Sequence, residues 1–463
     1  MINAALQHAA RQHDSHQAEL FDFLRLPSIS TDPAYAAPTA ATADWLAERL
    51  TAAGLENVRV IPTARHPLVY ADWLHAGPDA PTVLIYGHYD VQPADPLELW
   101  DTPPFEPQVR DDYVYARGAA DDKGQVYIHV KAAEAYLRAA GRLPLNVKFL
   151  IEGEEEIGSA NLRAFIPHNR DLLAADSALV SDSAILGPDR PALVYSLRGN
   201  CHVLLDITGP SRDLHSGTYG GSINNPLNAL GHLLAKLKNE FGHVMIPGFY
   251  DRVRPLSLEE RELLAQFPIS ETEWLAQTGA PALWGEPEYT LVERIGARPT
   301  LDVTGMWGGY IGEGSKTILP SAAHAKISMR LVPDQEPAEI AALFEQFVRD
   351  TLPPSVRATV RVGGGSRAAL IDRDTPPMRA AAAAYETTFG RPPVFMREGG
   401  SIPVVTDFGD QLGLPTVLMG FGLPGDRIHS PNERFYLPNF HKGIETSIRY
   451  LALLAAQSAA DPA

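Results

Sequence analysis

The apolar run Val83–Tyr86, with the residues directly after it, constrains the fold of this chain more than any other stretch. Such a run predicts a short buried strand in an α/β sheet. Gly87 ends the run, and His88 and Asp90 follow two residues apart. Residues i and i+2 of an extended segment point to the same side, so we expect both side chains beyond the strand's carboxyl end, where open α/β sheets place their sites. Taken alone, the pair favours a capped turn with a surface histidine.

Length and composition set the broad class. The 463 residues exceed what one hydrophobic core usually organises, which predicts two domains. The formal net charge of −17 argues against nucleic acid or an anionic membrane as a partner. No run approaches the roughly 18 apolar residues of a membrane span, and the N-terminus is patterned as an amphipathic helix rather than as a signal peptide.

The sequence contains one cysteine, Cys201, which excludes an intramolecular disulfide and favours a cytoplasmic location. We expect Cys201 to be a small buried hydrophobic residue rather than a nucleophile.

The pattern of predicted elements divides the chain. Residues 1–199 and 376–463 combine apolar strands with helices, as in an α/β domain. Between them, segments such as His202–Thr208 and Ala325–Val332 alternate apolar and polar residues like antiparallel strands. We therefore predict an inserted α+β domain over residues 200–375.

Further acidic residues follow other predicted strands of the first domain. Asp121 and Asp122 precede a helix predicted over Gln125–Ala140, and helix capping accounts for one of these two carboxylates but less well for both. Glu155 and Glu156 follow the predicted strand Val147–Ile151 within an acidic run that contains no basic residue.

Two more candidates complete the set. Asp182 follows the predicted strand Ala178–Ser181, and His429 comes after the predicted strand Thr416–Met419. Since the strand ends of one parallel sheet meet in one crevice, we expect all of these side chains to lie close together.

Histidine and carboxylate ligands without a thiolate suit zinc, with manganese or cobalt as alternatives. Two histidines and three carboxylates can hold two divalent ions if one carboxylate bridges them, and a further carboxylate can then act as a general base. A different signal, the phosphate-loop-like segment Gly309–Thr317, contains an extra Ser315 and is not followed by a helix, so we reject nucleotide binding.

Nine segments in order resemble the M20 family of metallopeptidases and, within it, the carnosinase-like and cytosolic non-specific dipeptidases. They are GHYDVQP (Gly87–Pro93), RGAADDKG (Arg117–Gly124), EGEEEIGS (Glu152–Ser159), SDS (Ser181–Ser183), HSG (His215–Gly217), SKTILP (Ser315–Pro320), MRLVPD (Met329–Asp334), EGGSIPV (Glu398–Val404) and HSPNE (His429–Glu433).

The resemblance implies a mixed-sheet α/β zinc-peptidase catalytic domain with an inserted α+β lid and dimerisation domain. It implies that two Zn²⁺ ions per subunit are held by five ligands, namely His88, Asp121 as the bridge, Glu156, Asp182 and His429. Asp90 is then the carboxylate that orients His88. Glu155 matches the general base that takes a proton from water and passes it to the leaving amine.

The same resemblance assigns roles in the inserted domain. His215 matches a histidine that stabilises the oxyanion in the active site of the dimer partner, although a polar turn beside glycines explains it equally well from the residues alone. Arg330 matches the residue that grips the substrate's C-terminal carboxylate. Thr317 and Ser401 match further substrate contacts.

We therefore expect a homodimeric dinuclear zinc dipeptidase. One alternative is an amidohydrolase of N-acyl or N-succinyl amino acids, which also presents a carboxylate to Arg330. Another is a catalytically silent binding protein on the same scaffold, which predicts loss of ligands or base that the sequence does not display.

Overall fold

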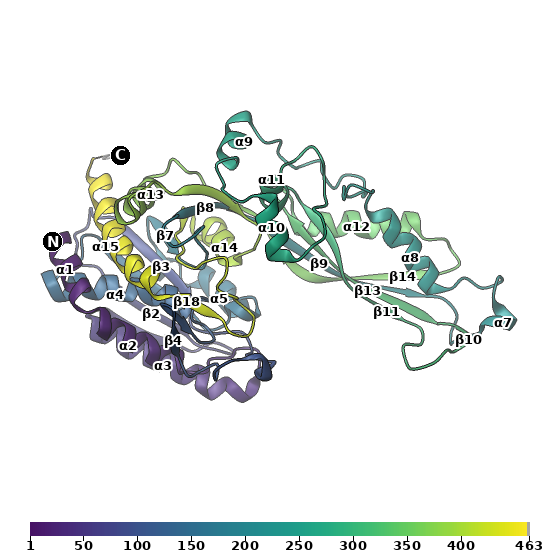
Figure 1. The fold of residues 1–463 in the computed structure, drawn as a ribbon, viewed down its shortest axis with the longest axis horizontal. Helices are drawn as coiled ribbons and strands as arrows, with labels where there is room; N and C mark the ends of the chain where they lie inside the picture. The colour runs from purple at the N-terminus through teal and green to yellow at the C-terminus, as the bar shows by residue number, and fades with distance from the viewer. Residues whose placement is uncertain (461–463) are drawn as a thin grey trace. The chain divides into compact units, whose positions relative to one another are not determined.

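The computed structural model describes the backbone of residues 1–460 and the side chains of residues 1–457. Two compact units make up the chain (Figure 1). Unit 1 comprises Met1–Tyr195, Ile371–Met396 and Ile402–Ala463, and unit 2 comprises Ser196–Leu370 and Arg397–Ser401. The α/β class predicted from the sequence is confirmed.

Unit 1 is built on a mixed sheet of nine strands in the order β1-β2-β6-β3-β7-β17-β8-β15, with β16 also paired to β8. The central strands β6, β3, β7 and β17 are parallel to their neighbours in this group. Their carboxyl ends therefore lie along one edge of the sheet. A small separate sheet, β18-β5-β4, lies in the same unit.

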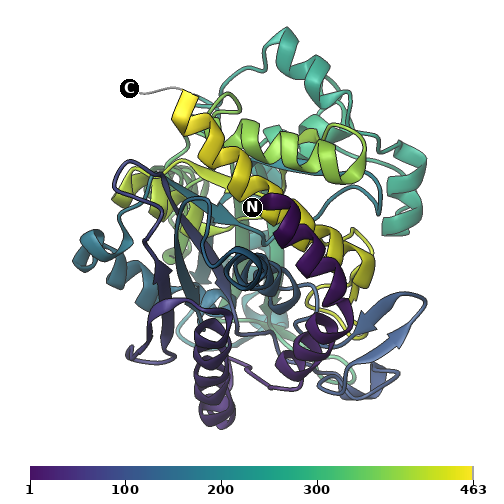
Figure 2. The same ribbon diagram turned by 90° about the vertical axis from the view of Figure 1, so that its left-hand side faces the viewer.

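Helices cover both faces of the large sheet, as the apolar central strands require. Tyr86 packs edge-on against Phe408 of α14, whereas Gly87 lies against Val126 of α4. Consecutive residues of β3 point to opposite faces, so α4 and α14 cover different faces. In Figure 2 the purple N-terminal helix α1 lies beside the yellow C-terminal helix α15, which also packs on α4.

The elements of unit 1 have the following bounds. Strands β8, β15 and β16 are included, and they lie where the chain passes from one unit to the other. The strands are β1 (Glu56–Ile61), β2 (Leu68–Trp73), β3 (Thr82–His88), β4 (Gln108–Arg110), β5 (Tyr113–Tyr115), β6 (Asn146–Glu152), β7 (Ser177–Val180), β8 (Ala192–Leu197), β15 (Ala369–Leu370), β16 (Val394–Glu398), β17 (Thr416–Leu418) and β18 (Arg434–Tyr436). The helices are α1 (Ile2–Arg11), α2 (His13–Leu24), α3 (Ala36–Ala53), α4 (Lys123–Ala140), α5 (Ala160–Phe165), α6 (Arg170–Leu173), α13 (Pro376–Phe389), α14 (Pro403–Leu412) and α15 (Leu437–Ala460), with short 3₁₀ turns η1 (Pro33–Tyr35), η2 (Leu97–Leu99), η3 (Glu155–Ile157) and η4 (Ile166–His168).

Unit 2 contains an antiparallel four-stranded sheet in the order β11-β13-β9-β14. Inward-facing residues of β9 and β13 alternate with more exposed ones, and they form a core with α8 and α12. Cys201 is part of this core and is fully buried, and burial raises the pKa of its thiol to about 11. These properties suit a packing residue and not a nucleophile.

The elements of unit 2 have the following bounds. The strands are β9 (Gly199–Thr208), β10 (Leu214–His215), β11 (Thr300–Gly308), β12 (Ile318–Leu319), β13 (Ala322–Leu331) and β14 (Arg357–Ser366). The helices are α7 (Ser216–Tyr219), α8 (Pro226–Leu237), α9 (Leu258–Leu264), α10 (Glu271–Thr278), α11 (Leu291–Ala297) and α12 (Pro337–Thr351). Among residues 1–460, no helix has both the length and the apolar character needed to cross a membrane.

Candidate metal centre

Five side chains from different segments meet beyond the carboxyl ends of the parallel strands. Each segment is placed by an element of unit 1: β3 ends at His88, η3 follows β6, Asp182 follows β7, and α4 begins just after Asp121. The loop between β17 and β18 carries His429. The strand ends that were expected to converge on one crevice therefore do so.

The side chains form two groups that share one carboxylate. His88, Asp121 and Asp182 make up one group, and the other consists of Asp121, Glu156 and His429. Within each group the potential ligand atoms all lie within 4.8 Å of one another. Asp121 thus occupies the position that a bridging ligand needs.

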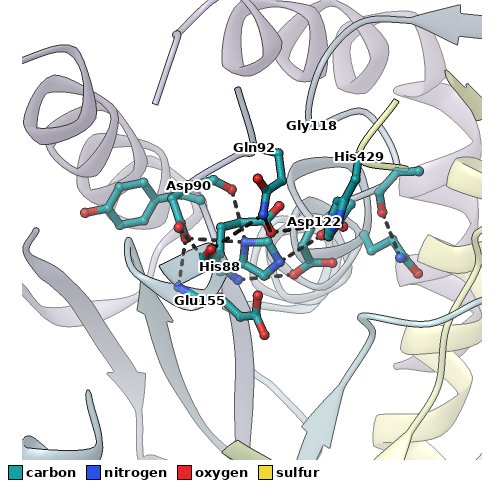
Figure 3. Close-up of polar contacts among 12 residues, drawn as sticks. His88, Asp90, Gln92, Gly118, Asp122, Glu155 and His429 are labelled. Atoms are coloured by element: carbon teal, nitrogen blue, oxygen red, sulfur yellow. Dashed lines mark hydrogen bonds and ion pairs between the residues drawn. The ribbon is translucent and has the colours of Figure 1, made fainter. Parts of the chain in front are cut away.

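Asp121 turns a different oxygen to each histidine. Its Oδ1 lies 3.0 Å from His88 Nε2, and its Oδ2 lies 2.9 Å from His429 Nε2. His429 Nε2 is also 3.2 Å from Glu156 Oε2. Figure 3 shows His88 and His429 approaching the same small space from opposite sides.

The donor set fits two divalent cations. His88 is fully buried, and its Nε2 makes no hydrogen bond despite the nearby carboxylate. Burial together with the charge of Asp121 raises the pKa of Asp182 to about 7. Burial, followed by the charges of Asp182 and Glu156, also raises the pKa of Glu155 well above its ordinary value, against the opposing effect of His88. Bound cations would relieve this crowding of negative groups.

Asp90 belongs to neither group, and it contacts the site in two ways. Its backbone carbonyl lies 3.0 Å from His88 Nδ1, and its Oδ1 lies 3.4 Å from the same atom. The carboxylate accepts hydrogen bonds from the backbone N–H groups of Glu155 and Glu156, at 3.2 and 3.1 Å. Asp90 therefore contacts the His88 ring and also fixes the turn that carries both glutamates.

The start of α4 differs from a capped helix. Asp122 is the N-cap residue, but its side chain makes no capping hydrogen bond. Its Oδ2 instead accepts from the backbone N–H of His88 at 3.2 Å. A Cβ atom at Gly87 would lie 2.7 Å from this oxygen and 2.5 Å from Val126 Cγ2, so only glycine permits this close approach of β3 and α4.

Sequence reasoning assigned no role to two other residues of the quoted motifs. Gln92 donates a hydrogen bond from Nε2 to Glu156 Oε2 at 2.7 Å (Figure 3). Glu433 binds the loop before Asp121 through both carboxylate oxygens. Gln92 lies in the motif GHYDVQP and Glu433 in HSPNE, so the motifs could have indicated that both residues matter. The atoms that they contact could not be predicted, because these contacts depend on how the loops fold.

The remaining predicted site residues belong to unit 2 and form two pairs. His215 on β10 is paired with Ile318 of β12, and the backbone N–H of Ser216 donates to the carbonyl of Thr317 at 3.0 Å. Arg330 Nη1 donates to Ser401 Oγ at 3.0 Å. Ser401 Oγ in turn donates to the Arg198 carbonyl at 2.5 Å.

Comparison with known proteins gives the family. The family model described as Peptidase family M20/M25/M40 matches residues 84–453. The chain belongs to this family, as the sequence motifs predicted, and it is a metallopeptidase, an enzyme that hydrolyses peptide bonds.

Individual relatives resemble most of the chain. Cys-Gly metallodipeptidase DUG1 of Saccharomyces cerevisiae is 30% identical over 448 residues, which cover 92% of this chain and 93% of that protein. Beta-Ala-His dipeptidase of Homo sapiens is 31% identical over 382 residues, which cover 81% and 75%. The crystal structure of the M20 family metallo-carboxypeptidase Sso-CP2 from Sulfolobus solfataricus has a TM-score of 0.86 at 33% identity and covers 95% of this chain and 99% of its own.

Proposed function

We propose that this enzyme is a dinuclear zinc dipeptidase in which a glutamate acts as general base. The observation that carries the proposal is the pair of ligand groups that share Asp121. Two histidines and three carboxylates are a suitable set for two zinc ions, and manganese or cobalt could take their place. Bound ions would supply Lewis acidity, which polarises a substrate carbonyl and lowers the pKa of a water molecule.

Glu155 is the proposed general base. It lies beside Glu156 in η3 but outside both ligand groups. The hydrogen bond from its backbone to Asp90 fixes the turn, so that Glu155 can face a substrate while Glu156 faces the ligands. Glu155 would take a proton from the attacking water and then give it to the amine nitrogen when the peptide bond breaks.

Arg330 is the proposed binding site for the substrate's terminal carboxylate. Its guanidinium is held by Ser401 and lies near Arg198, where burial and the charge of Arg330 lower the pKa of Arg198 to about 10. Two guanidinium groups in a partly buried place favour an anionic ligand. Ser401, which contacts Arg330, is proposed to take part in the same subsite.

His215 is proposed to donate a hydrogen bond to the tetrahedral oxyanion. Its Nδ1 accepts from the backbone N–H of Gly217 at 3.0 Å. The proton of the neutral ring is then on Nε2, which leaves an N–H group free to donate. The side chain is exposed, as a residue that acts on an external group must be.

The geometry of unit 2 supports action across a dimer. His215 is paired with Ile318, and Asp213, two residues before His215, accepts from the backbone N–H of Ser321 at 3.0 Å. His215 and Thr317 therefore lie toward the start of β13, whereas Arg330 lies near its end. Arg330 is eight positions after Ala322 along the extended strand, which corresponds to about 26 Å. A dipeptide spans only about 7 Å. Arg330 and His215 of one chain therefore cannot hold the same dipeptide, so we propose a homodimer in which His215 and Thr317 serve the partner's site.

A substrate panel tests the proposed reaction. The curated relatives named above are dipeptidases of Cys-Gly and beta-Ala-His, and the similar solved structure is a carboxypeptidase. We expect zinc-loaded enzyme to release amino acids from free dipeptides, and to act much more slowly on dipeptides with an amidated C-terminus, which Arg330 would not bind. Faster cleavage of N-acetyl or N-succinyl amino acids would favour the amidohydrolase alternative. The absence of turnover on every member of the panel, with two ions bound, would contradict the proposed dipeptidase activity.

A cytoplasmic location is proposed on the presence of a single cysteine in the sequence. Cell fractionation with an antibody to the protein tests this proposal.

A further inference from the structure

Glu433 lies outside both ligand groups, yet it joins the two segments that carry Asp121 and His429. It is fully buried at the end of the loop that contains His429. Its Oε1 accepts from the backbone N–H groups of Ala120 and Asp121, at 2.9 and 3.2 Å. The second oxygen, Oε2, accepts from the Gly118 N–H at 2.9 Å and from Arg117 Nη1 at 2.7 Å.

All four partners of this carboxylate are donors, so both of its oxygens must be acceptors. Only an ionised carboxylate provides two acceptor oxygens on one planar group of this size. An amide at this position would turn an NH₂ group toward two donors and leave them unpaired in a buried place, which is costly. The contacts of Glu433 are therefore specific for a carboxylate.

The segment that Glu433 holds has a shape that depends on these contacts. Gly118 has a φ of +81°, and a Cβ atom there would lie 2.5 Å from Val91 Cγ1. This turn directs the N–H groups of Gly118, Ala120 and Asp121 toward Glu433, in the manner of an anion-binding nest. Arg117 also donates from Nη2 to the Pro93 carbonyl at 3.0 Å, which connects the nest to the segment that follows His88.

The loop that contains His429 is also held by contacts with the segment around Leu99 and Asp101. His429 itself has a φ of +59°, and Asn432 has a φ of +61°. Such values are uncommon for residues other than glycine and persist where surrounding contacts impose them. Asn432 accepts from the Asp101 N–H and donates to the Leu99 carbonyl, both at 2.9 Å.

We propose that Glu433 is a positioning residue that sets the spacing of Asp121 and His429, and thereby the affinity of the centre for its metal ions. It fixes the backbone of Asp121 directly and forms one end of the loop that presents His429. This inference rests on the proposed dinuclear metal centre and adds a residue that positions its ligands. Neither the ligand atoms nor the general base is changed when Glu433 is replaced.

The test is a metal titration of Glu433→Gln. Removal of a residue that orients ligands typically lowers metal affinity about 10–100-fold. We expect this loss when Zn²⁺ binding to the apoenzyme is measured by calorimetry, together with a changed visible absorption spectrum when Co²⁺ replaces zinc. The spectrum reports the ligand arrangement, which a purely structural role of Glu433 would leave unaltered.

Asp72→Asn provides the matched control. Asp72 is also buried in unit 1, where it accepts from Asn57 Nδ2 at 2.8 Å and from the Tyr70 hydroxyl at 2.9 Å. It is paired with Lys148, whereas His88 is paired with Glu152 at the other end of β6. The control is expected to lose stability but to keep the metal affinities and the Co²⁺ spectrum of the unmodified enzyme.

Glu433→Asp keeps both acceptor oxygens one methylene shorter and is expected to fall between the unmodified enzyme and Glu433→Gln. If Glu433→Gln does not fold, the same titration is made on Glu433→Asp. Unchanged affinity and spectrum in the variants that fold would overturn the positioning role. If the unmodified enzyme fails to bind two ions, the proposed centre itself is wrong, and this outcome is distinct from the first.

Discussion

Asp121 is the residue that the two ligand groups of the proposed centre share. Because its two oxygens face different histidines, at 3.0 and 2.9 Å, one side chain can serve both ligand groups. Its own carboxyl is held ionised: burial would raise its pKa, but the neighbouring imidazoles of His429 and His88 outweigh burial and lower the pKa. A carboxylate that stays charged in a buried place is suited to bind cations.

Glu155 is expected to act in the reaction without holding the ions. Glu155→Ala should therefore bind two zinc ions with unchanged affinity. Its rate of dipeptide hydrolysis should fall by about 10²–10⁴-fold, the usual contribution of a general base. Metal content measured by mass spectrometry, together with the rate of amino acid release, checks this expectation. Substantial residual turnover in the variant would remove Glu155 from the role of base.

For individual residues, the sequence was sufficient to predict the candidate ligands but not the contacts of Gln92 and Glu433 with the ligand segments. His88 and Asp182 follow apolar strands, and that pattern is local and visible in the sequence. The contacts of Gln92 and Glu433 join segments far apart in the chain, and the distance between such segments depends on how the loops pack. Local pattern carries no information about that packing.

Among the elements, α4 connects the metal centre with the C-terminal helix. His129 of α4 is fully buried, with Nε2 2.6 Å from Ser181 Oγ and Nδ1 2.9 Å from Ser447 Oγ of α15. Ser181 directly precedes Asp182, one of the proposed ligands. The helix thus contacts the end of β7 through a neutral imidazole.

The titration of His129 predicts how stability depends on pH. Burial lowers its pKa from 6.5 to about 3 in the folded protein. Between these values the unfolded chain binds a proton that the folded chain does not, so the stability from this residue is complete above pH 6.5 and decreases as the pH falls. The slope is about 1.4 kcal/mol per pH unit.

His129→Gln, which cannot be protonated in this range, tests that sign. Urea unfolding of the unmodified enzyme should lose about 2 kcal/mol more between pH 7.5 and 5.0 than unfolding of the variant. Groups that titrate in both proteins cancel in this comparison. Equal pH dependence of the two proteins would show that His129 is not the neutral buried group described above.

Elements with clear periodicity were predicted well, and interrupted ones were not. The helix predicted over Gln125–Ala140 is α4, which begins two residues earlier at Lys123 and ends at Ala140 as predicted. The N-terminus was expected to form one helix, but the structure has α1 and α2, separated at Gln12. The residues around Gln12 contain no proline or glycine that would have marked the interruption.

For the whole molecule, the separation of His215 from Arg330 leads to a test by mixing two inactive variants. If His215 acts on the partner, a dimer of one Glu155→Ala chain and one His215→Ala chain has one complete site. This site takes Glu155 from the second chain and His215 from the first.

Random exchange between equal amounts of the two variants should restore about one quarter of the unmodified activity, since half of the dimers are mixed and each has one complete site. Sedimentation confirms that exchange has occurred. Activity no greater than the sum of the separate variants, despite exchange, would contradict action across the interface.

The measurement that tests the central claim most directly is a zinc titration of the apoenzyme with a free dipeptide as substrate. Ions bound and rate of hydrolysis are followed together. We predict binding of two zinc ions per chain, full activity only when both are bound, and loss of both ions and of activity in Asp121→Ala, because that residue is shared by the two groups. Full activity with one ion per chain, or with none, would contradict the dinuclear site.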